Sequence, residues 1–260
     1  MKLFLTGVTG TLGSKFIELF HTKYKIVGYS RDEYKQYEMK KKYKNVKFEI
    51  GDVRDYNRVN ESMKGCDYVI HTAALKHITM GESQPEEFIK TNIQGTINVV
   101  KAAKENNIKD LIFTSTDKAV EPINLYGATK LCGEKIVLNY GYKIVRYGNV
   151  FGSRGSVVPH FLKIRSTGCL RLSDPTLTRF SLTIEEATRF VERSLHGKKQ
   201  ICIPQLKAYI LKDLAKAVCP SCKIEVYGLE SGEKKHELLD TNISSNDAQK
   251  LTVEELKKLL

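Results

Sequence analysis

The chain has 260 residues, 41% of them hydrophobic and 28% charged, a composition typical of a folded protein with a sizeable core. It contains no apolar run of about 18 residues, so we expect no membrane span and a cytoplasmic location. The net charge of +12 comes largely from scattered lysines, without a nucleic-acid-binding motif, and we expect no nucleic-acid partner.

The first half of the chain alternates strand and helix patterns, which predicts a Rossmann-like, doubly wound parallel sheet covered by helices. We expect strands at 2–5, 25–29, 46–50, 68–71, 110–115 and 143–146, and helices at 12–20, 85–107 and 126–139. Residues 200–204 predict a strand that returns to the sheet, and 251–260 a short helix capped by Thr252 and Glu255. These patterns indicate a dinucleotide-binding domain at 1–150 and a smaller, interleaved C-terminal lobe at 151–260 that binds substrate.

A glycine-rich turn follows the first predicted strand and opens the first helix. Gly7, Gly10 and Gly13 would let the backbone approach a pyrophosphate at the helix N-terminus. At the end of the second strand, Ser30, Arg31 and Lys35 suit the 2′-phosphate of NADP, whereas Asp32 would instead suit the ribose of NAD. NADP is therefore the favoured cofactor. Asp52 and Val53 follow the third strand and are expected at the adenine; the alternative for Asp52 or Asp55 is a helix cap.

Five reactive side chains lie at and beyond the end of the fifth strand: Thr116, Asp117, Lys118, Tyr126 and Lys130. Tyr126 and Lys130 are one helical turn apart, and a nearby ammonium would favour the tyrosinate, so the pair could move a proton to or from a sugar hydroxyl held by Thr116. Asp117 and Lys118 add an acid and a base, as an elimination requires. Lys118 would be the base if neighbouring cations lower its pKa, and Asp117 the acid if burial raises its pKa. The alternative is a surface Asp-Lys turn.

The six cysteines are expected to be reduced and structural. Only Cys219-Pro-Ser-Cys222 has the spacing of a zinc or redox pair, and no second ligand pair accompanies it. We expect no metal site.

This set of Thr, Tyr and Lys behind a glycine-rich turn resembles the extended short-chain dehydrogenase/reductase family. The segments STDKAVEPINLYGATKLCGEK, YSRDEYKQYEM, AALKHITMGESQPEEFIKTNIQGT, VRYGNVFGSRGSVVPHF, TRFSLT and GEKKHE resemble the inverting UDP-N-acetylglucosamine 4,6-dehydratases, over nearly the whole chain. The resemblance implies oxidation of a UDP-sugar at carbon 4, loss of water across carbons 5 and 6, reduction at carbon 6 and inversion at carbon 5. It also implies recycled NADP, a homo-oligomer, and a place in the synthesis of surface sugars such as pseudaminic acid.

The resemblance also assigns site residues. It implies elimination and inversion by Asp117 and Lys118, and oxidation by Tyr126 and Lys130. For the cofactor, the expected residues are Gly7, Thr9, Gly10, Thr11, Leu12, Gly13, Ser30, Arg31, Lys35, Asp52, Val53, Ala73, Lys76, Tyr126, Lys130 and Val150. For the substrate they are Asn149, Arg154, Gly155, Ser156, Val157, Val158, Thr178 and Glu233, with Arg171 and Arg179 as further candidates and His77 and His160 as structural residues.

Three features bear on which member of the family this is. Tyr126 stands where retaining dehydratases commonly carry Met, which favours inversion. Glu230 begins a Glu-Ser-Gly-Glu-Lys segment where the family usually has Arg-Pro-Gly-Glu-Lys, so a positive charge expected near the phosphates has become negative. The segment 139–143 and the region after GEKKHE are shorter than in the family. A retaining dehydratase, a 4-epimerase or reductase, UDP-glucose as substrate, and a non-catalytic NADP-binding sensor remain alternatives.

Overall fold

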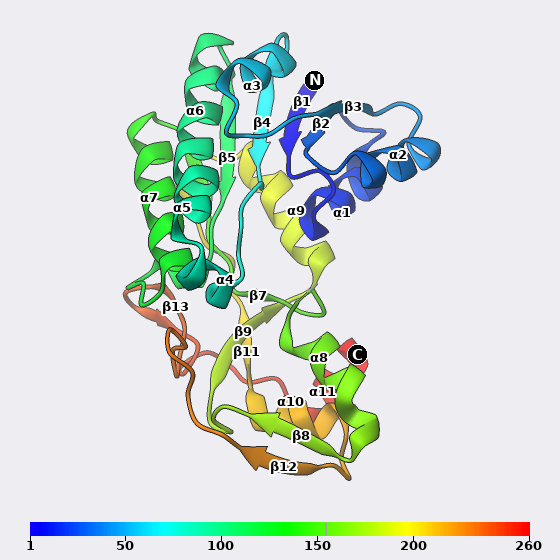
Figure 1. Ribbon diagram of the computed structural model, residues 1–260, viewed down its shortest axis with the longest axis vertical. Coiled ribbons are helices and arrows are strands. Elements are labelled where there is room, and N and C mark those ends of the chain that lie inside the picture. The colour runs from blue at the N-terminus through cyan, green and yellow to red at the C-terminus, as the bar shows by residue number, and fades with distance from the viewer. Residues whose placement is uncertain (154) are drawn as a thin grey trace.

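A computed structural model describes residues 1–153 and 155–260; the expected substrate residue Arg154 lies outside them. Seven parallel strands form the central sheet in the order β10-β6-β5-β4-β1-β2-β3 (Figure 1). Their bounds are β1 Lys2–Thr6, β2 Lys25–Ser30, β3 Lys47–Ile50, β4 Tyr68–His71, β5 Asp110–Thr114, β6 Lys143–Val145 and β10 Ile201–Cys202. The Rossmann-like parallel sheet is thus confirmed, and the predicted last strand returns to the sheet beside β6.

Helices cover both faces of this sheet, because successive apolar side chains of a strand point to opposite faces and both sets must be buried. Leu3 and Leu5 of β1 pack with α1 (Thr11–Phe20) and α9 (Ile184–Leu195), while Phe4 packs on the opposite face with α3 (Tyr56–Met63), α6 (Gly95–Glu105) and α7 (Leu125–Asn139). Figure 1 shows α1 and α9 on one side of the sheet and α6 and α7 on the other. The helix α2 (Glu33–Lys42) follows β2.

The helix predicted over 85–107 is continuous but not uniform. It runs as α5 (Pro85–Phe88), a π-helical segment (Ile89–Gln94) and α6, after the short α4 (Ile78–Ser83). Within the π-helical segment, Asn92 accepts a hydrogen bond from Leu75 N at 2.8 Å and donates to Leu75 O at 2.9 Å. This segment therefore fixes the loop after β4, which contains the expected cofactor residue Ala73.

The remaining chain builds a second, smaller region at the carboxyl end of the sheet (Figure 1). It contains a three-stranded sheet of β7 (Asn149–Val150), β9 (Thr178–Leu182) and β11 (Lys207–Ile210), and the pairs β8 (Cys169–Leu172) with β12 (Lys223–Val226) and β13 (Leu238–Asp240) with β14 (Ile243–Ser244). The helices α8 (Val157–Ile164), α10 (Leu211–Val218) and α11 (Val253–Leu259) contribute to its apolar core. The predicted capping box of Thr252 and Glu255 is present at α11.

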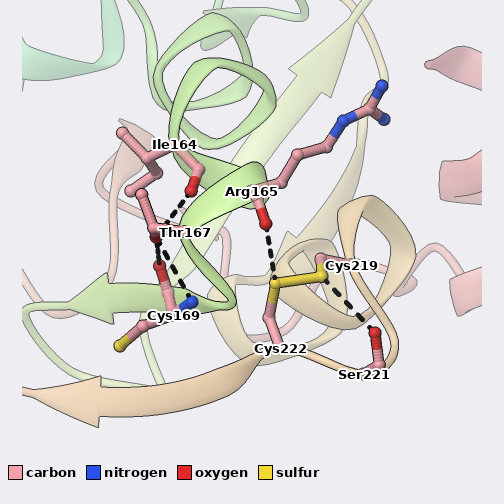
Figure 2. The surroundings of a disulfide bond; sticks show 7 residues. All are labelled: Ile164, Arg165, Thr167, Cys169, Cys219, Ser221 and Cys222. Atoms are coloured by element: carbon pink, nitrogen blue, oxygen red, sulfur yellow. Dashed lines mark hydrogen bonds between the residues drawn. A yellow bond between two sulfur atoms is a disulfide. The ribbon is translucent and has the colours of Figure 1, made fainter.

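One expectation about the cysteines is wrong: Cys219 and Cys222 form a disulfide (Figure 2). The turn Pro220-Ser221 between α10 and β12 brings their Cα atoms to 5.4 Å, within disulfide reach. Because the sulfurs are bonded to each other, this pair is not a zinc site. Cys66, Cys132, Cys169 and Cys202 are free, as expected.

Within the described residues, no helix combines the length and the apolar character needed to cross a lipid bilayer.

Candidate active site

The glycine-rich turn after β1 is too crowded for side chains. Gly7 has φ +68°, and a Cβ there would lie 2.6 Å from Thr72 Oγ1 and 2.9 Å from Ala73 N. A Cβ on Gly13 would lie 2.4 Å from Gly7 O, so α1 starts directly against the turn. Gly10 N donates to Gly7 O at 2.8 Å. The backbone is therefore held where a phosphate could approach it closely.

A cavity of about 250 Å³ opens beside this turn. Its walls include the expected cofactor residues Gly7, Thr9, Gly10, Ser30, Arg31, Asp52, Val53 and Ala73. Gly10, the N-cap of α1, offers no side-chain acceptor to the first N–H groups of that helix. Another lining residue, Thr91, has a buried hydroxyl without a hydrogen-bond partner. These open donors and the glycine turn fit a dinucleotide pyrophosphate.

The outer end of this cavity carries the residues expected to choose between NADP and NAD. Arg31 Nη1 lies 3.5 Å from Asp52 Oδ2, which Arg54 also holds at 2.6 Å. Burial would raise the pKa of Asp52, but its contacts with Arg54 and Arg31 outweigh burial and lower that pKa. Asp32 caps α2 and forms an ion pair with Lys35. Asp55, not Asp52, caps α3. Arg31 is therefore placed to meet an anion at this end.

Other expected cofactor residues lie away from the walls of this cavity. Thr11, Leu12 and Gly13 form the first turn of α1, where Leu12 packs into the core. Lys35 is on the exposed face of α2. Lys76, Tyr126, Lys130 and Val150 do not line the cavity either.

The helix α7 brings Tyr126 and Lys130 close to the end of β5. Its N-cap Asn124 accepts a hydrogen bond from Gly127 N at 2.8 Å. A Cβ on Gly127 would lie 2.1 Å from Lys118 O, and one on Gly133 would lie 2.6 Å from Phe113 Cζ. Glycine at both positions lets α7 approach the strand end. Lys130 Nζ donates to Thr114 O at 2.6 Å and lies 3.7 Å from the centroid of the Phe113 ring.

Burial dominates the titration of this Tyr/Lys pair. It lowers the pKa of Lys130 to about 7, with Glu134 opposing the shift only in part. It raises the pKa of Tyr126 to about 12, although Lys118 and Thr116 favour the tyrosinate. A nearby ammonium does favour the tyrosinate, as expected, but it is that of Lys118, and desolvation by burial exceeds its effect on the Tyr126 pKa.

Asp117 and Lys118 lie in a short 3-10 helix (Asp117–Ala119) that follows β5. Thr116 Oγ1 donates to Asp117 Oδ1 at 2.9 Å, and Lys118 Nζ donates to the same oxygen at 3.1 Å. Lys118 Nζ also lies 3.1 Å from Glu237 Oε1 and 3.3 Å from Asn149 Oδ1. The alternative of a surface Asp-Lys turn is excluded, because Asp117 is fully buried.

The pKa shifts of this pair agree with expectation at Asp117 and differ at Lys118. Burial raises the pKa of Asp117, although the Lys118 ammonium opposes the shift. Burial alone would lower the pKa of Lys118, but the carboxylates of Asp117 and Glu237 outweigh it and raise that pKa. The expected lowering of the Lys118 pKa by neighbouring cations is wrong, because two carboxylates contact the ammonium.

A larger cavity of about 1170 Å³ lies between Lys118 and the second region. Of the expected substrate residues, Asn149, Gly155, Ser156, Val157 and Glu233 line it, as do Arg171, Arg179 and His160. Val158 packs into the apolar core of the second region instead. Thr178 is buried, and its hydroxyl is within hydrogen-bond distance of His236 Nδ1 at 2.8 Å and Ser245 Oγ at 2.7 Å.

Two acidic residues of this cavity stand out. Glu230, the departure from the family pattern, is on its wall, and its Oε1 accepts a hydrogen bond from the Tyr227 hydroxyl at 3.2 Å. Glu237 is buried at the wall and contacts Lys118, yet the sequence reasoning did not single it out. The sequence feature that could have identified Glu237 is its place at the end of the segment GEKKHE, in which only Glu233 was predicted to bind substrate.

Comparisons with known proteins agree with this architecture. The family model described as "Polysaccharide biosynthesis protein" matches residues 3–256. The UDP-N-acetylglucosamine 4,6-dehydratase (inverting) of Campylobacter jejuni subsp. jejuni serotype O:2 is 42% identical, over 95% of this chain and 78% of that protein. The UDP-glucose 4-epimerase of Rickettsia canadensis is 38% identical, over 95% and 79%. The X-ray structure of Pen from Bacillus thuringiensis superposes with a TM-score of 0.92 at 32% identity, covering 99% and 97% of the two chains.

Proposed function

Because the chain belongs to the polysaccharide biosynthesis protein family, together with the inverting UDP-N-acetylglucosamine 4,6-dehydratases, we propose that it dehydrates UDP-N-acetylglucosamine with inversion at carbon 5. The product would be UDP-2-acetamido-2,6-dideoxy-β-L-arabino-hex-4-ulose, an early intermediate for surface sugars such as pseudaminic acid. One observation carries the proposal: the buried Asp117 and the partly exposed Lys118 lie beside the Tyr126/Lys130 helix. Oxidation and reduction at carbon 4 alone would not need this second acid and base.

The two cavities suit the two bound molecules. In this proposal NADP binds in the cavity at the glycine turn, with Arg31 on the 2′-phosphate, and residues 1–150 supply most of its contacts. The UDP-sugar binds in the larger cavity, where Arg171 offers positive charge for the diphosphate, while Arg179 on the same wall is paired with Glu233. The region 151–260 would then be mainly substrate-binding, and we expect the enzyme to act as a cytoplasmic homo-oligomer.

The side chains divide the reaction among them. When bound, the dinucleotide supplies the oxidation at carbon 4 and the later reduction at carbon 6 by carrying one hydride. Tyr126 takes the hydroxyl proton at carbon 4 as its own phenol proton passes to the amine form of Lys130, whose pKa of about 7 permits either charge state. The carbon 4 ketone acidifies the neighbouring C–H. Lys118, on the cavity wall, removes the carbon 5 proton as an amine, after the ammonium that Asp117 and Glu237 favour has released its proton to solvent in the cavity. Asp117 supplies the proton for the departing hydroxyl through its neighbour Thr116.

A UDP-glucose 4-epimerase is the second candidate, since a relative with that name is 38% identical to this chain. An epimerase would use Tyr126 and Lys130 alone. It would leave Asp117 and Lys118 without a role in proton transfer.

The test is proton NMR of UDP-N-acetylglucosamine incubated with the NADP-loaded protein in deuterated water. Inverting dehydration gives a new methyl signal, deuterium at carbon 5 and the couplings of the L-arabino ketone. A D-xylo pattern would mean a retaining dehydratase. A 4-epimer without a methyl signal would support the epimerase.

Variants of the acid and base separate the two chemistries. Asp117→Asn and Lys118→Gln should abolish the methyl signal, because elimination loses its acid or its base. Tyr126→Phe should stop both dehydration and epimerisation. If Asp117→Asn and Lys118→Gln dehydrate at the wild-type rate, the proposed mechanism is wrong.

A further inference from the structure

Glu237 is a buried carboxylate beside the proposed acid and base. Its side chain is 3% exposed, and Oε1 lies 3.1 Å from Lys118 Nζ and 4.0 Å from Arg179 Nε. Its Oε2 is buried without a hydrogen-bond partner. The backbone is fixed from both sides, since Glu237 N donates to Ser245 Oγ and Ser245 N donates to Glu237 O, each at 2.8 Å. These two bonds hold the Glu237 backbone at the cavity wall, and its carboxylate contacts Lys118 from there.

The charges around Lys118 do not balance. One ammonium lies between two carboxylates, those of Asp117 and Glu237, each 3.1 Å away. Glu237 also faces a second cation, Arg179. In the part of the chain that the structure describes, Asp117 has Lys118 as its only ion-pair partner within 4.0 Å. When the cluster binds a proton, protonating Asp117 therefore costs less free energy than protonating Glu237, which stays ionised.

We propose that Glu237 is a positioning residue that holds the Lys118 ammonium and thereby keeps the Asp117 carboxyl protonated. The inference rests on the proposed function only in that Asp117 is the acid whose proton the reaction needs. Without the Glu237 charge, the ammonium would pair with Asp117 alone, and Asp117 would release its proton at lower pH. The raised pKa of Asp117, to which burial contributes most and the Glu237 charge adds, is consistent with this role.

Other groups facing the cluster could contribute to its titration. They are Arg179 on β9, Tyr126 on α7, Tyr209 on β11, and Glu233 and Lys234 just before Glu237. Of these, Glu233 offers a matched control. It lines the same cavity and pairs with Arg179 at 3.0 Å, and Lys118 is not among its ion-pair partners.

The experiment compares wild type, Glu237→Gln and Glu233→Gln by the pH dependence of kcat/KM for UDP-N-acetylglucosamine in the NADP-loaded enzyme. Gln preserves the shape of Glu237 and can still accept from Lys118. We expect the alkaline limb of Glu237→Gln to move to lower pH by about one unit or more, with activity recovering as the pH is lowered. The midpoint of Glu233→Gln should move less than that of Glu237→Gln, because Glu233 pairs with Arg179 and not with Lys118. Lower activity of Glu237→Gln at every pH, with an unchanged midpoint, would overturn the proposal.

A second readout does not need turnover. In protein labelled with 13C at the Asp carboxyl, the Asp117 resonance is identified by its loss in Asp117→Asn. Its titration midpoint should fall in Glu237→Gln, and an unchanged midpoint would overturn the proposal. If wild type does not dehydrate UDP-N-acetylglucosamine, the proposed function fails while this titration still tests Glu237. Should Glu237→Gln unfold, Glu237→Asp, which withdraws the charge from Lys118, should give a smaller shift in the same direction, and no shift would contradict it.

Discussion

At the scale of single residues, Lys130 shows a conflict between stability and chemistry. Its ammonium is buried under α7, with a carbonyl and an aromatic ring as contacts and Glu134 as only a partial electrostatic offset. Glu134 instead makes its ion pair with Arg146 at 2.7 Å. Keeping a lysine in such a place disfavours its charged form, which destabilises the fold but provides a group that can gain or lose a proton near neutral pH.

We therefore predict that Lys130→Met abolishes turnover and raises the free energy of unfolding at pH 7 by about 2–4 kcal/mol. The folded pKa of about 7 is below the usual 10.5, so the unfolded chain binds more protons between these pH values. Wild-type stability should rise with pH across this window, and the rise should be weaker in the variant. Urea unfolding from pH 7 to 10 measures both effects, with the exposed Lys135→Met on the same helix as control. A loss of stability in Lys130→Met at pH 7 would contradict the burial argument.

Arg31 is the residue on which the choice of NADP depends. It is half exposed at the edge of the small cavity, and its ion-pair partner Asp52 is shared with Arg54. We predict that Arg31→Ala weakens NADP binding by about 10- to 100-fold, the effect of losing a hydrogen bond to a charged group, and changes NAD binding little. Calorimetric titration with both dinucleotides measures the ratio, with Lys41→Ala on the outer part of α2 as the charge control. An unchanged NADP/NAD ratio would favour NAD as the natural cofactor.

At the scale of elements, the C-terminal region depends on short connections. The disulfide joins the end of α10 to the start of β12, and Cys222 Sγ lies 3.4 Å from the Arg165 carbonyl oxygen after α8 (Figure 2). The strand β12 pairs with β8, which carries the cavity residue Arg171, and leads to Tyr227 and Glu230 on the same wall. The bond therefore constrains one side of the substrate cavity.

We predict that Cys219→Ser with Cys222→Ser lowers the free energy of unfolding by about 2 kcal/mol or less, because the loop closed by this disulfide is very short. Dinucleotide binding should be unaffected, since none of the residues lining the small cavity belongs to this region. We would measure thermal unfolding with and without reductant. The variant Cys132→Ser, at an exposed free cysteine, is the control. A wild-type protein insensitive to reductant would show that the bond contributes nothing to stability.

Some helices and strands could be predicted from local sequence patterns, and others could not. Strands and helices of the first half were predictable because apolar side chains must alternate or repeat to bury one face or both. The π-helical segment within 85–107 was not, because Asn92 is held there by the distant Leu75. The disulfide was not predicted, because the cysteines were assumed to be reduced. The three-residue spacing of Cys219 and Cys222 was visible in the sequence, but the turn that brings their sulfurs together was not.

At the scale of the whole molecule, a buried ion pair ties the C-terminal segment to the sheet. Arg146, just after β6, donates to both carboxylate oxygens of Glu134, at 2.8 and 2.7 Å, and to Leu239 O in β13 at 3.3 Å. The pair is almost completely buried. Because β13 directly follows Glu237 in the chain, this contact helps to fix the cavity wall that carries Glu237 beside Lys118.

We predict that Arg146→Met destabilises the protein by about 3–5 kcal/mol, because it leaves Glu134 as an uncompensated buried charge. The double variant Glu134→Met with Arg146→Met should recover most of this loss, as an apolar pair fills the same space without a charge. Urea unfolding of the two single variants and the double variant closes the cycle. If the double variant is as unstable as the sum of the singles, the two side chains are not energetically coupled.

The sequence by itself determined the sheet, the glycine turn and the Tyr/Lys pair, because each depends on the spacing of residues within one local segment. It also identified Asp117 and Lys118, since both directly follow a recognisable strand. Only the tertiary structure decided which charges surround them. Glu237 is far from Lys118 in the chain and reaches it through the fold of the second region, and this contact reverses the expected shift of the Lys118 pKa. Charge state depends on desolvation and on neighbours in space, and neither is written in residue spacing.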